Sequence, residues 1–555
     1  MNKLLIRCEN FLKGIFMKLF KSKLSTAAAI FLMIVGILIG TQIQNVFSGD
    51  DLYDQLQKFQ DVVSLVDKYY VENIDTQKLV DAAINGLLTQ LDPHSVYIPS
   101  KEVQQISEDF KGSFDGIGIE YDVVNDSLLV VSPIAGGPSE MVGLEAGDKI
   151  IEIDGKSAIG ITRDEVQKKL RGPKGTKVTV TVARNGMNKP LEFEITRDKI
   201  PLYSVSASFM VTDEVGYVYV NRFAETTSKE LEAALEKLKS EGMKELILDL
   251  RDNPGGLLDQ AVDVASEFVP DGKTIVYTKG RVQQANENFA STGGSYTKIP
   301  LIVLINGGSA SASEIVSGSI QDLDRGLIVG ETSFGKGLVQ RQFPLRDGSA
   351  VRITVARYYT PSGRLIQRPY GKDRTKYFMA AMQIDSSEES GSNISHTIES
   401  DSGREVYKTV SGRAVYGGGG ITPDYIVKMA KVPNFIYDFQ VKRIFLEYVD
   451  SHYSQSQEKL KSDYGTLEQF DENFQVGGKI LDDIYSQAVK AGIKVTRDEY
   501  DANEKIVAML IKAQIGRNVW GNDGWYRVVL DYDKQFEKAV TLFPEASEIA
   551  GLKLK

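Results

Sequence analysis

Apolar residues change their spacing several times along the chain, and each spacing predicts a different kind of structure. Residues 24–49 carry no charge and centre on the run AAAIFLMIVGILIG, which is long enough to cross a bilayer once. Residues 51–110 repeat apolar positions at helical spacing, which predicts a helical region. Residues 111–199 change to short β-branched runs between Gly and Pro signals, typical of a compact, mostly β module. The strands expected there are Ser127–Val131, Lys149–Ile153, Lys177–Val182 and Leu191–Ile195, with one helix at Arg163–Leu170.

Residues 200–432 alternate apolar strands with helices, which predicts an α/β layer fold that binds ligands near its strand ends. Within this region, residues 385–403 are rich in Ser and Glu and indicate a solvated or flexible insertion. Residues 433–555 return to helical spacing. The strands expected in the α/β region are Val215–Val220, Glu245–Leu250, Leu301–Ile305, Leu327–Val329 and Val351–Ala356, with helices at Ser228–Glu241, after Gly256 and from Ser311.

The charges on the two sides of the apolar run are strongly asymmetric. Six basic residues and one acid precede it, and Asp50 and Asp51 follow it. The positive-inside rule then places residues 1–24 in the cytoplasm and predicts a transmembrane signal anchor at residues 25–48. A cleavable signal peptide is the alternative, although no A-x-A-like site follows the run. We expect a single-pass protein of a bacterial inner membrane, with its catalytic part in the periplasm or outside the cell.

The composition of the chain argues against several classes of function and site. The chain has 65 basic and 75 acidic residues, and this net charge of −10 argues against a general nucleic-acid binder. The only cysteine is Cys8, which excludes an intramolecular disulfide framework and a cysteine-based zinc site. With only three histidines, the chain is also poor in metal ligands, and we expect no metal or cofactor. A hydrolase of this composition needs a base other than histidine.

Three segments of the α/β region could carry chemistry, and each follows an expected strand. Residues 248–256, LDLRDNPGG, leave glycine N–H groups free to bind an anion. Residues 306–314, NGGSASASE, open a helix whose N-terminus favours developing negative charge, so one of the serines could be a nucleophile. Chemistry alone does not choose among Ser309, Ser311 and Ser313.

The third segment, GETSFGKGLVQ at residues 330–340, supplies a candidate base. Lys336 lies between two glycines and beside Phe334, and a lysine drawn into an apolar site loses proton affinity. Gln340 could hydrogen-bond the amine and fix its position. No histidine occurs between Phe110 and Gly391, so a Ser–Lys dyad is the arrangement that this region can supply.

These segments, in this order, resemble the bacterial C-terminal processing (tail-specific) peptidases, a family of Ser–Lys endopeptidases. The resemblance runs from about Asp51 to Val427 and includes LDPHS at residues 91–95, LRGPKGT at 170–176 and GGITPD at 419–424. It implies a ClpP/crotonase-like core in which the middle serine of S-A-S-A-S precedes the lysine by 25 positions. The residues that it implies are the catalytic Ser311, Lys336 and Gln340, and an oxyanion hole from Gly255 or Gly256 together with Ala312.

The β module resembles a PDZ domain, which the family carries inserted before its catalytic core. Its carboxylate-binding loop would be Gly116, Ile117, Gly118 and Ile119, whose N–H groups could capture a chain-terminal carboxylate while the peptide adds as a strand. Ile117, Ile119, Val166 and Leu170 could line a pocket for an apolar last side chain. Arg171 follows the flanking helix and could sense whether the groove is occupied.

We therefore expect an envelope serine endopeptidase that recognises apolar C-terminal tails of exported proteins through its PDZ domain. Its partners would be protein substrates with accessible C-termini, the membrane through one helix, and a second copy or an adaptor through the C-terminal helices. One alternative is a non-catalytic PDZ scaffold with a hydrolase-like core. Another is a crotonase-like acyl-transfer enzyme, but no basic cluster near Gly255 suits a nucleotide-bearing thioester.

Overall fold

The computed structural model describes residues 50–124, 126–134, 136–382, 391–392, 404–453 and 456–552. The chain divides into two compact units, Met1–Gly86 and Leu87–Lys555. No helix among the described residues is long and apolar enough to cross a membrane. The predicted cytoplasmic segment and anchor, residues 1–48, lie outside the described residues, as does most of the predicted insertion at 385–403.

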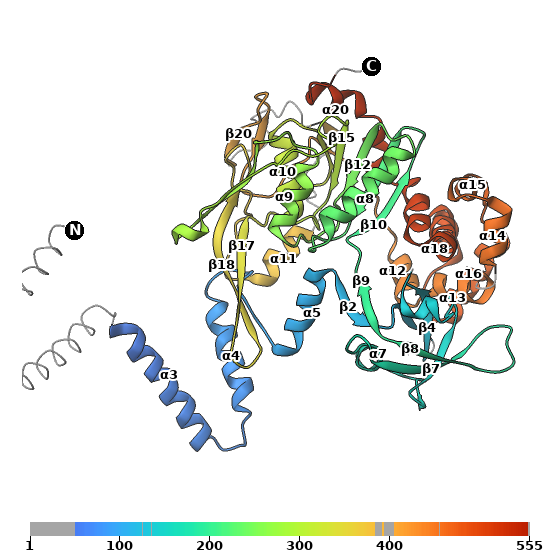
Figure 1. Ribbon diagram of the computed structural model, residues 1–555, viewed down its shortest axis with the longest axis horizontal. Coiled ribbons are helices and arrows are strands. Elements are labelled where there is room, and N and C mark those ends of the chain that lie inside the picture. Colours follow the sequence, from blue (N-terminus) through green and yellow to red (C-terminus); the bar gives the residue numbers. More distant parts are fainter. Residues whose placement is uncertain are drawn as a thin grey trace, which may run out of the picture. The chain divides into compact units, whose positions relative to one another are not determined.

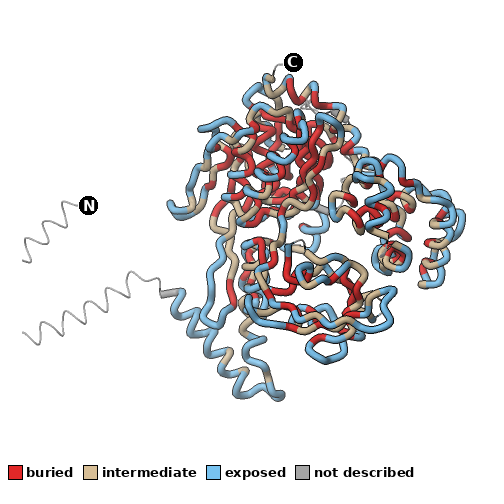
Figure 2. The backbone as a smooth tube through the Cα atoms, turned by 45° about the vertical axis from the view of Figure 1, so that its right-hand side comes forward, coloured by how far each residue is buried: buried red, intermediate tan, exposed pale blue. Residues whose placement is uncertain are grey.

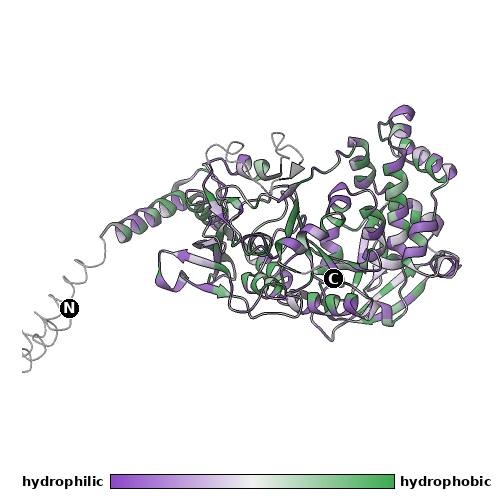
Figure 3. Cartoon of the chain, turned by 90° about the horizontal axis from the view of Figure 1, so that it is seen from above, coloured by the Kyte–Doolittle hydropathy of each residue, from purple (hydrophilic) through white to green (hydrophobic). Residues whose placement is uncertain are grey.

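The first unit contains helix α3 (Asp50–Tyr69) and most of α4 (Thr76–Leu88). In Figure 3, α3 is the helix that follows the grey N-terminal trace, and it carries both hydrophobic and hydrophilic stretches. Its apolar residues recur at the helical spacing seen in the sequence, and several of them, such as Leu56 and Phe59, are exposed within the described part of the chain.

The second unit begins with a short strand, a helix and the β module. Strand β1 (Val96–Ile98) and helix α5 (Ser100–Lys111) precede a ribbon of β2 (Ser113–Gly116) and β9 (Asp198–Pro201). Between β2 and β9 the sheet of the module has the order β3-β4-β5-β7-β8, with β6 (Lys156–Ser157) paired to β5. All four predicted strands and the predicted helix are confirmed. Their bounds are β3 (Ile119–Val124), β4 (Ser127–Pro133), α6 (Pro138–Met141), β5 (Lys149–Ile153), α7 (Arg163–Leu170), β7 (Lys177–Ala183) and β8 (Leu191–Thr196).

A seven-stranded sheet of order β10-β11-β12-β15-β16-β22-β19 forms the centre of the α/β region. Its middle strands are parallel, and only the edge strands β10 and β19 run antiparallel to their neighbours. The predicted alternation of strands and helices is confirmed here. The bounds are β10 (Val205–Met210), β11 (Val215–Val220), α8 (Thr227–Ser240), β12 (Glu245–Asp249), α9 (Leu258–Ser266), β15 (Leu301–Ile305), α10 (Ala312–Asp322), β16 (Leu327–Gly330), β19 (Gly391–Ser392) and β22 (Tyr425–Ile426).

Both faces of this sheet are covered, because alternate strand residues point to opposite sides. Leu301, Val303 and Ile305 of β15 join one buried cluster with apolar residues of α8, α9 and α10. Ile302 and Leu304 join a second cluster on the other face. The buried backbone of this layer forms the dense red region in Figure 2.

A second, antiparallel sheet of order β1-β18-β13-β14 stands beside the first, and β17 pairs with β18 (Figure 1). The apolar run Val351–Ala356 therefore forms a strand as predicted, but in this second sheet rather than in the parallel layer. The hairpin β17–β18 matters for the site because Lys336 immediately precedes it. The bounds are β13 (Thr274–Gly280), β14 (Asn288–Ala290), β17 (Leu338–Pro344) and β18 (Ala350–Tyr359), followed by α11 (Arg374–Met382), β20 (Val406–Lys408) and β21 (Ala414–Tyr416).

The C-terminal region is helical, as predicted, but it serves two different parts of the fold. Most of its helices bury their apolar faces in a cluster of their own, against which Trp520 and Trp525 pack. The last two helices and the turn between them instead supply Phe536, Ala539, Leu542, Phe543 and Ala546 to the second face of the central sheet. The bounds are α12 (Asn434–Val441), α13 (Ile444–Tyr453), α14 (Gln457–Tyr464), α15 (Leu467–Asn473), α16 (Gly478–Lys490), α17 (Arg497–Ala502), α18 (Glu504–Leu530), α19 (Lys534–Val540) and α20 (Phe543–Ile549).

Candidate active site

The three candidate serines at the start of α10 have different surroundings. The hydroxyls of Ser309 and Ser313 are fully buried and donate hydrogen bonds to the carbonyls of Leu250 (2.8 Å) and Asn253 (2.9 Å). Ser311 alone of the three is partly exposed. It has φ 54° and ψ −109°, a region that a residue other than glycine rarely adopts. Such strain persists only where surrounding structure enforces it, which is common at active sites.

Glu314 connects Ser311 to the segment of Lys336. One carboxylate oxygen, Oε2, accepts hydrogen bonds from the backbone N–H of Ser311 (2.9 Å) and of Lys336 (2.8 Å). The other oxygen accepts from the hydroxyl of Ser333 (2.5 Å) and the N–H of Gly335 (2.7 Å). Glu314 is completely buried, and burial raises its pKa against the lowering effect of these bonds. The backbone N–H groups of Ser311 and Lys336 thus share one acceptor oxygen, which holds the two predicted residues close together.

Lys336 has the electrostatic environment of a base. Its pKa is lowered from 10.5 to about 8, first by burial and then by the positive charge of Arg352, while the carboxylates of Glu314 and Asp92 oppose the shift. An amine with this pKa is neutral in a usable fraction of molecules near neutral pH. Lys336 therefore combines a backbone held close to that of Ser311 by Glu314 with a proton affinity suited to accepting a proton.

Gln340 lies on β17 but does not make the contact that the sequence suggested. The hydrogen bonds that its amide donates go to the carbonyl of Leu338 and to Oγ1 of Thr354, both at 3.4 Å. A hydrogen bond to the Lys336 amine is not among its contacts with the described residues. The β-bulge between Val339 and Gln340 changes the register of the hairpin at this point, and the side chain turns along the strand toward Thr354.

The turn after β12 lies directly against Ser311. A Cβ added to Gly255 would lie 2.8 Å from Cβ of Ser311 and 2.9 Å from the amide nitrogen of Ala312. The N–H of Gly255 is already used, because it donates to Oδ1 of Asn253 (2.9 Å). The N–H groups of Gly256 and Ala312 donate to no partner among the described residues. Of the two candidate glycines, Gly256 is therefore the one with a free donor.

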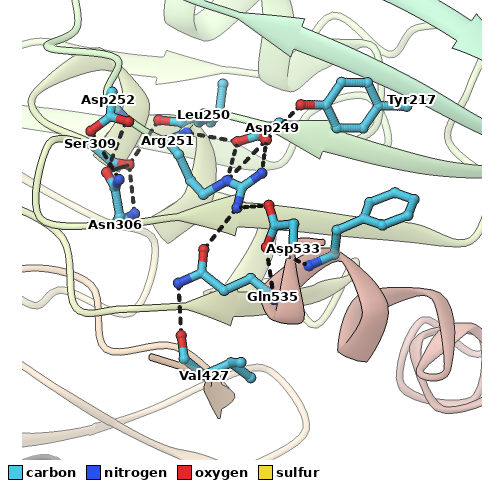
Figure 4. A network of polar contacts seen from close by, with 11 residues as sticks. Tyr217, Asp249, Leu250, Arg251, Asp252, Asn306, Ser309, Val427, Asp533 and Gln535 are labelled. Atoms are coloured by element: carbon cyan, nitrogen blue, oxygen red, sulfur yellow. Dashed lines mark hydrogen bonds and ion pairs between the residues drawn. The ribbon is translucent and has the colours of Figure 1, made fainter. Parts of the chain in front are cut away.

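Two further side chains fix this turn. Asn253 is fully buried, and its side-chain amide donates to the carbonyl of Val220 (2.8 Å) and accepts from the N–H of Gly255. Its backbone carbonyl accepts from the N–H of Ala310 (3.0 Å) and the hydroxyl of Ser313 (2.9 Å). Arg251 binds Asp249 through Nε and Nη2 and reaches Asp533 and Gln535 at the start of α19, as Figure 4 shows. The C-terminal helix thereby contacts the segment that presents Gly256.

Two residues near Lys336 belong to the LDPHS segment, more than 200 positions earlier, which the sequence analysis counted in the family resemblance but did not assign to the site. Asp92 accepts hydrogen bonds from Ser95 and from Oγ1 of Thr354, and its charge acts on Lys336. His94 lies 3.0 Å from the hydroxyl of Tyr377 and packs edge-on against Phe334. Burial, followed by the charge of Lys336, lowers its pKa to about 4, so His94 is neutral near pH 7. The signals available in the sequence were the rarity of histidine and the LDPHS motif.

The predicted peptide-binding residues gather in the β module. Gly116 ends β2, Ile119 begins β3, and the backbone N–H groups of Ile117 and Gly118 between them donate to no partner among the described residues. Ile117, Val166 and Leu170 are buried in the core of the module, and Ile119 packs against that core. Arg171 pairs with Glu108 of α5 at 2.7 Å and stacks on the ring of Phe114.

Family models match four parts of the chain. Residues 214–373 match peptidase family S41, a range that includes Ser311 and Lys336. Residues 129–184 match a PDZ domain, and residues 40–102 match the N-terminal domain of the activating protease CtpB. Residues 435–521, most of the C-terminal helices, match a family of unknown function.

Known relatives agree with these matches. A carboxy-terminal-processing protease of Bartonella bacilliformis is 45% identical over 320 residues, which cover 57% of this chain and 73% of the relative. The carboxy-terminal processing protease CtpA of Bacillus subtilis is 35% identical over 366 residues, 66% of this chain and 77% of the relative. Among solved structures, the photosystem II D1 C-terminal processing protease matches 56% of this chain and 89% of its own, with 31% identity and a TM-score of 0.31. On the family match and the relatives together, the chain belongs to peptidase family S41 and is a serine-type endopeptidase of the carboxy-terminal processing kind.

Proposed function

We propose that Ser311 is the nucleophile of this peptidase and that Lys336 is its general base. The observation that carries the proposal is the lowered pKa of Lys336, about 8, beside the strained and partly exposed Ser311. Histidine is absent from residues 95–395, so the matched family segment offers no histidine base. The hydrogen bonds of Ser309 and Ser313 give those serines a structural role instead.

In this mechanism neutral Lys336 takes the proton of the Ser311 hydroxyl as Oγ attacks the substrate carbonyl. The free N–H groups of Gly256 and Ala312 stabilise the negative oxygen of the tetrahedral intermediate. The Lys336 ammonium then gives its proton to the departing amine, which leaves an ester on Ser311. A water that loses its proton to Lys336 hydrolyses the ester, and the proton returns to Ser311. Gln340, on strand β17 after the Lys336 segment, supports the site without taking part in a proton transfer.

We propose that the PDZ domain selects substrates by an apolar C-terminus. The unpaired N–H groups of Ile117 and Gly118 suit a terminal carboxylate, and the apolar side chains of Ile117, Val166 and Leu170, buried in the core next to this loop, suit an apolar last side chain. The peptide would add as a strand along β3. Arg171, which links the end of α7 to Glu108, is placed to respond when the groove fills.

The decisive experiment measures cleavage of an unfolded protein by the full chain, with substrate tails that end in apolar or charged residues. We expect Ser311→Ala and Lys336→Ala to lose at least 1000-fold in kcat/KM. Ser309→Ala and Ser313→Ala are matched controls in the same loop and should keep activity at temperatures where they remain folded. Undiminished cleavage by Ser311→Ala would refute the dyad, and equal cleavage of both tails would refute the tail preference.

We also propose that residues 25–48 anchor the chain in a bacterial inner membrane, with residues after Asp50 in the periplasm or outside the cell. The support is the charge asymmetry around the apolar run. Substrates would then be exported proteins. Protease added to intact spheroplasts should digest the catalytic part and spare an N-terminal tag.

For a second copy or an adaptor, α12 to α18 offer the remaining helical surface, because α19 and α20 face the sheet.

A further inference from the structure

A cavity of about 430 Å³ opens beside the turn that presents Gly256. Its walls come from the end of α5, from the residues after β11 and from Pro254 to Gly256. Most of the lining is apolar, with Ile106, Phe110 and Phe223 among the contributors. The backbone of Phe223 pairs with Gly255 and Leu257, which holds this wall directly against the turn.

Two guanidinium groups and one carboxylate face this cavity. Arg222 lies 3.8 Å from Asp109, so these two charges offset each other. Arg352 projects from β18, where its Nη2 donates to Oε1 of Gln342 (3.2 Å) and its guanidinium lies over the ring of Phe110. No carboxylate lies within ion-pair distance of Arg352 in the described part of the chain. The cavity therefore holds one positive charge without an acidic partner.

The position of Arg352 relates this charge to the reaction. Arg352 lines the cavity, and its charge is the second cause of the lowered pKa of Lys336, so one guanidinium belongs to the cavity wall and also acts on the base. Burial lowers the pKa of Arg352 itself, which reflects the cost of holding an unpaired guanidinium in this environment. A bound anion would remove that cost.

We propose that this cavity is a substrate subsite in which Arg352 binds a carboxylate of the peptide chain close to the scissile bond. A guanidinium binds a carboxylate through two parallel N–H···O bonds, and the apolar walls would hold the methylene groups that carry it. The inference rests on the proposed function of Ser311 and Lys336. It adds a specificity at the reaction centre that is separate from recognition of the tail by the PDZ domain.

Two sources could supply this carboxylate: an Asp or Glu side chain next to the scissile bond, or the terminal carboxylate of a short tail. A first peptide series keeps the apolar C-terminus constant and places Glu, Gln or Leu at each position flanking the bond. A second series contains no acidic side chain and varies only the number of residues between the bond and the C-terminus. If a side chain supplies the carboxylate, the Glu peptide is preferred at one position of the first series. If the terminal carboxylate supplies it, one short tail is preferred in the second series.

The measurement is kcat/KM of the full chain and of two variants on both series. We expect the wild type to favour the carboxylate peptide over its neutral partner about tenfold at one position, and Arg352→Gln to reduce that ratio below twofold. Arg346→Gln is the matched control, because Arg346 is exposed in the turn of the same hairpin and should keep the wild-type ratio. A ratio within one enzyme is insensitive to any change that Arg352→Gln causes in the pKa of Lys336.

Binding separates failure of the subsite from failure of the peptidase. The Ser311→Ala chain, with and without Arg352→Gln, is titrated with the same labelled Glu and Gln peptides by fluorescence anisotropy. Tighter binding of the Glu peptide that depends on Arg352 supports the subsite even if the wild type cleaves nothing. Cleavage without a preference in either series, or a preference that survives Arg352→Gln, overturns the subsite and leaves the peptidase standing. Equal binding of the Glu and Gln peptides, with no preference for one tail length in the second series, overturns the subsite, and absence of cleavage of every peptide overturns the peptidase.

Discussion

Replacing Lys336 with methionine should make the folded protein more stable while it abolishes activity. Burial lowers the pKa of this amine from 10.5 to about 8. One pKa unit corresponds to about 1.4 kcal/mol, so at pH 7 the charged lysine destabilises the folded state by about 3 kcal/mol. Methionine retains an unbranched apolar chain without the amine. We therefore expect Lys336→Met to raise the free energy of unfolding by up to about 3 kcal/mol at pH 7.

The gain should depend on pH in a definite direction. Below pH 8 the lysine is charged in both folded and unfolded chains, and the full cost is present. Between pH 8 and 10.5 the folded protein loses its proton while the unfolded chain retains it, so the cost shrinks as the pH rises. At pH 9.5 we expect roughly half of the gain seen at pH 7.

The assay has to measure the stability of the α/β layer and not that of the C-terminal helices. Trp520 and Trp525 both lie in α18, so tryptophan fluorescence would follow the C-terminal helices instead. Hydrogen exchange of residues 301–330 in increasing urea gives the free energy of opening of the central strands. Lys229→Met, an exposed position on α8, is the control and should change stability by less than about 0.5 kcal/mol. No stabilisation at pH 7, or the same gain at pH 7 and 9.5, would refute the reasoning.

Three more predictions concern the site. First, kcat/KM should fall about tenfold per pH unit below the Lys336 pKa of about 8 and level off above it, because only the neutral amine accepts a proton; a flat profile from pH 6 to 8 would contradict this. Second, Gly256→Ala should lower kcat at least 100-fold, since its Cβ would lie 2.0 Å from the Phe223 carbonyl and displace the turn; wild-type kcat would exclude Gly256 as a donor. Third, Asp533→Ala should destabilise the core by about 3 kcal/mol in urea unfolding, because it breaks a buried pair with Arg251 and removes the N-cap of α19. Thr496→Ala, which removes only the N-cap of α17, should cost about 1 kcal/mol, and equal losses in the two variants would contradict a special role for Arg251.

The sequence predicted the fold best where structure is set by local spacing. Apolar runs alternating with helical spacing located β11, β12, β15 and β16, because a parallel strand buried on both faces is apolar throughout. The short β-branched runs of the PDZ domain were located equally well. The run at Val351–Ala356 was recognised as a strand but assigned to the wrong sheet, since spacing shows that a strand exists and not which strand it pairs with.

The candidate site could be predicted only in part, because its electrostatics depend on contacts between distant segments. The spacing of Ser311 and Lys336 came from the family resemblance. The carboxyl of Asp92 and the guanidinium of Arg352 act on the charge of Lys336 from two different segments of the chain, and no local sequence pattern predicts either interaction. Gln340 was placed by its offset from Lys336, but the β-bulge beside it directs its amide to Thr354.

The catalytic core extends beyond the segment that sequence similarity identifies. The family match ends at residue 373, whereas the second face of the central sheet is covered by Phe536, Leu542 and Phe543, which belong to the last two helices and the turn between them. Without them, the apolar side chains of Ile302 and Leu304 would face water, and Arg251 would lose Asp533 and Gln535 as partners. Arg251 begins the turn that leads to Gly256, and the carbonyl of Asn253 in that turn holds the loop of Ser311. The end of the chain is therefore linked to the turn of Gly256 through the contacts of Arg251 and the backbone from Arg251 to Asn253, although it lies more than 200 positions from Ser311 in sequence.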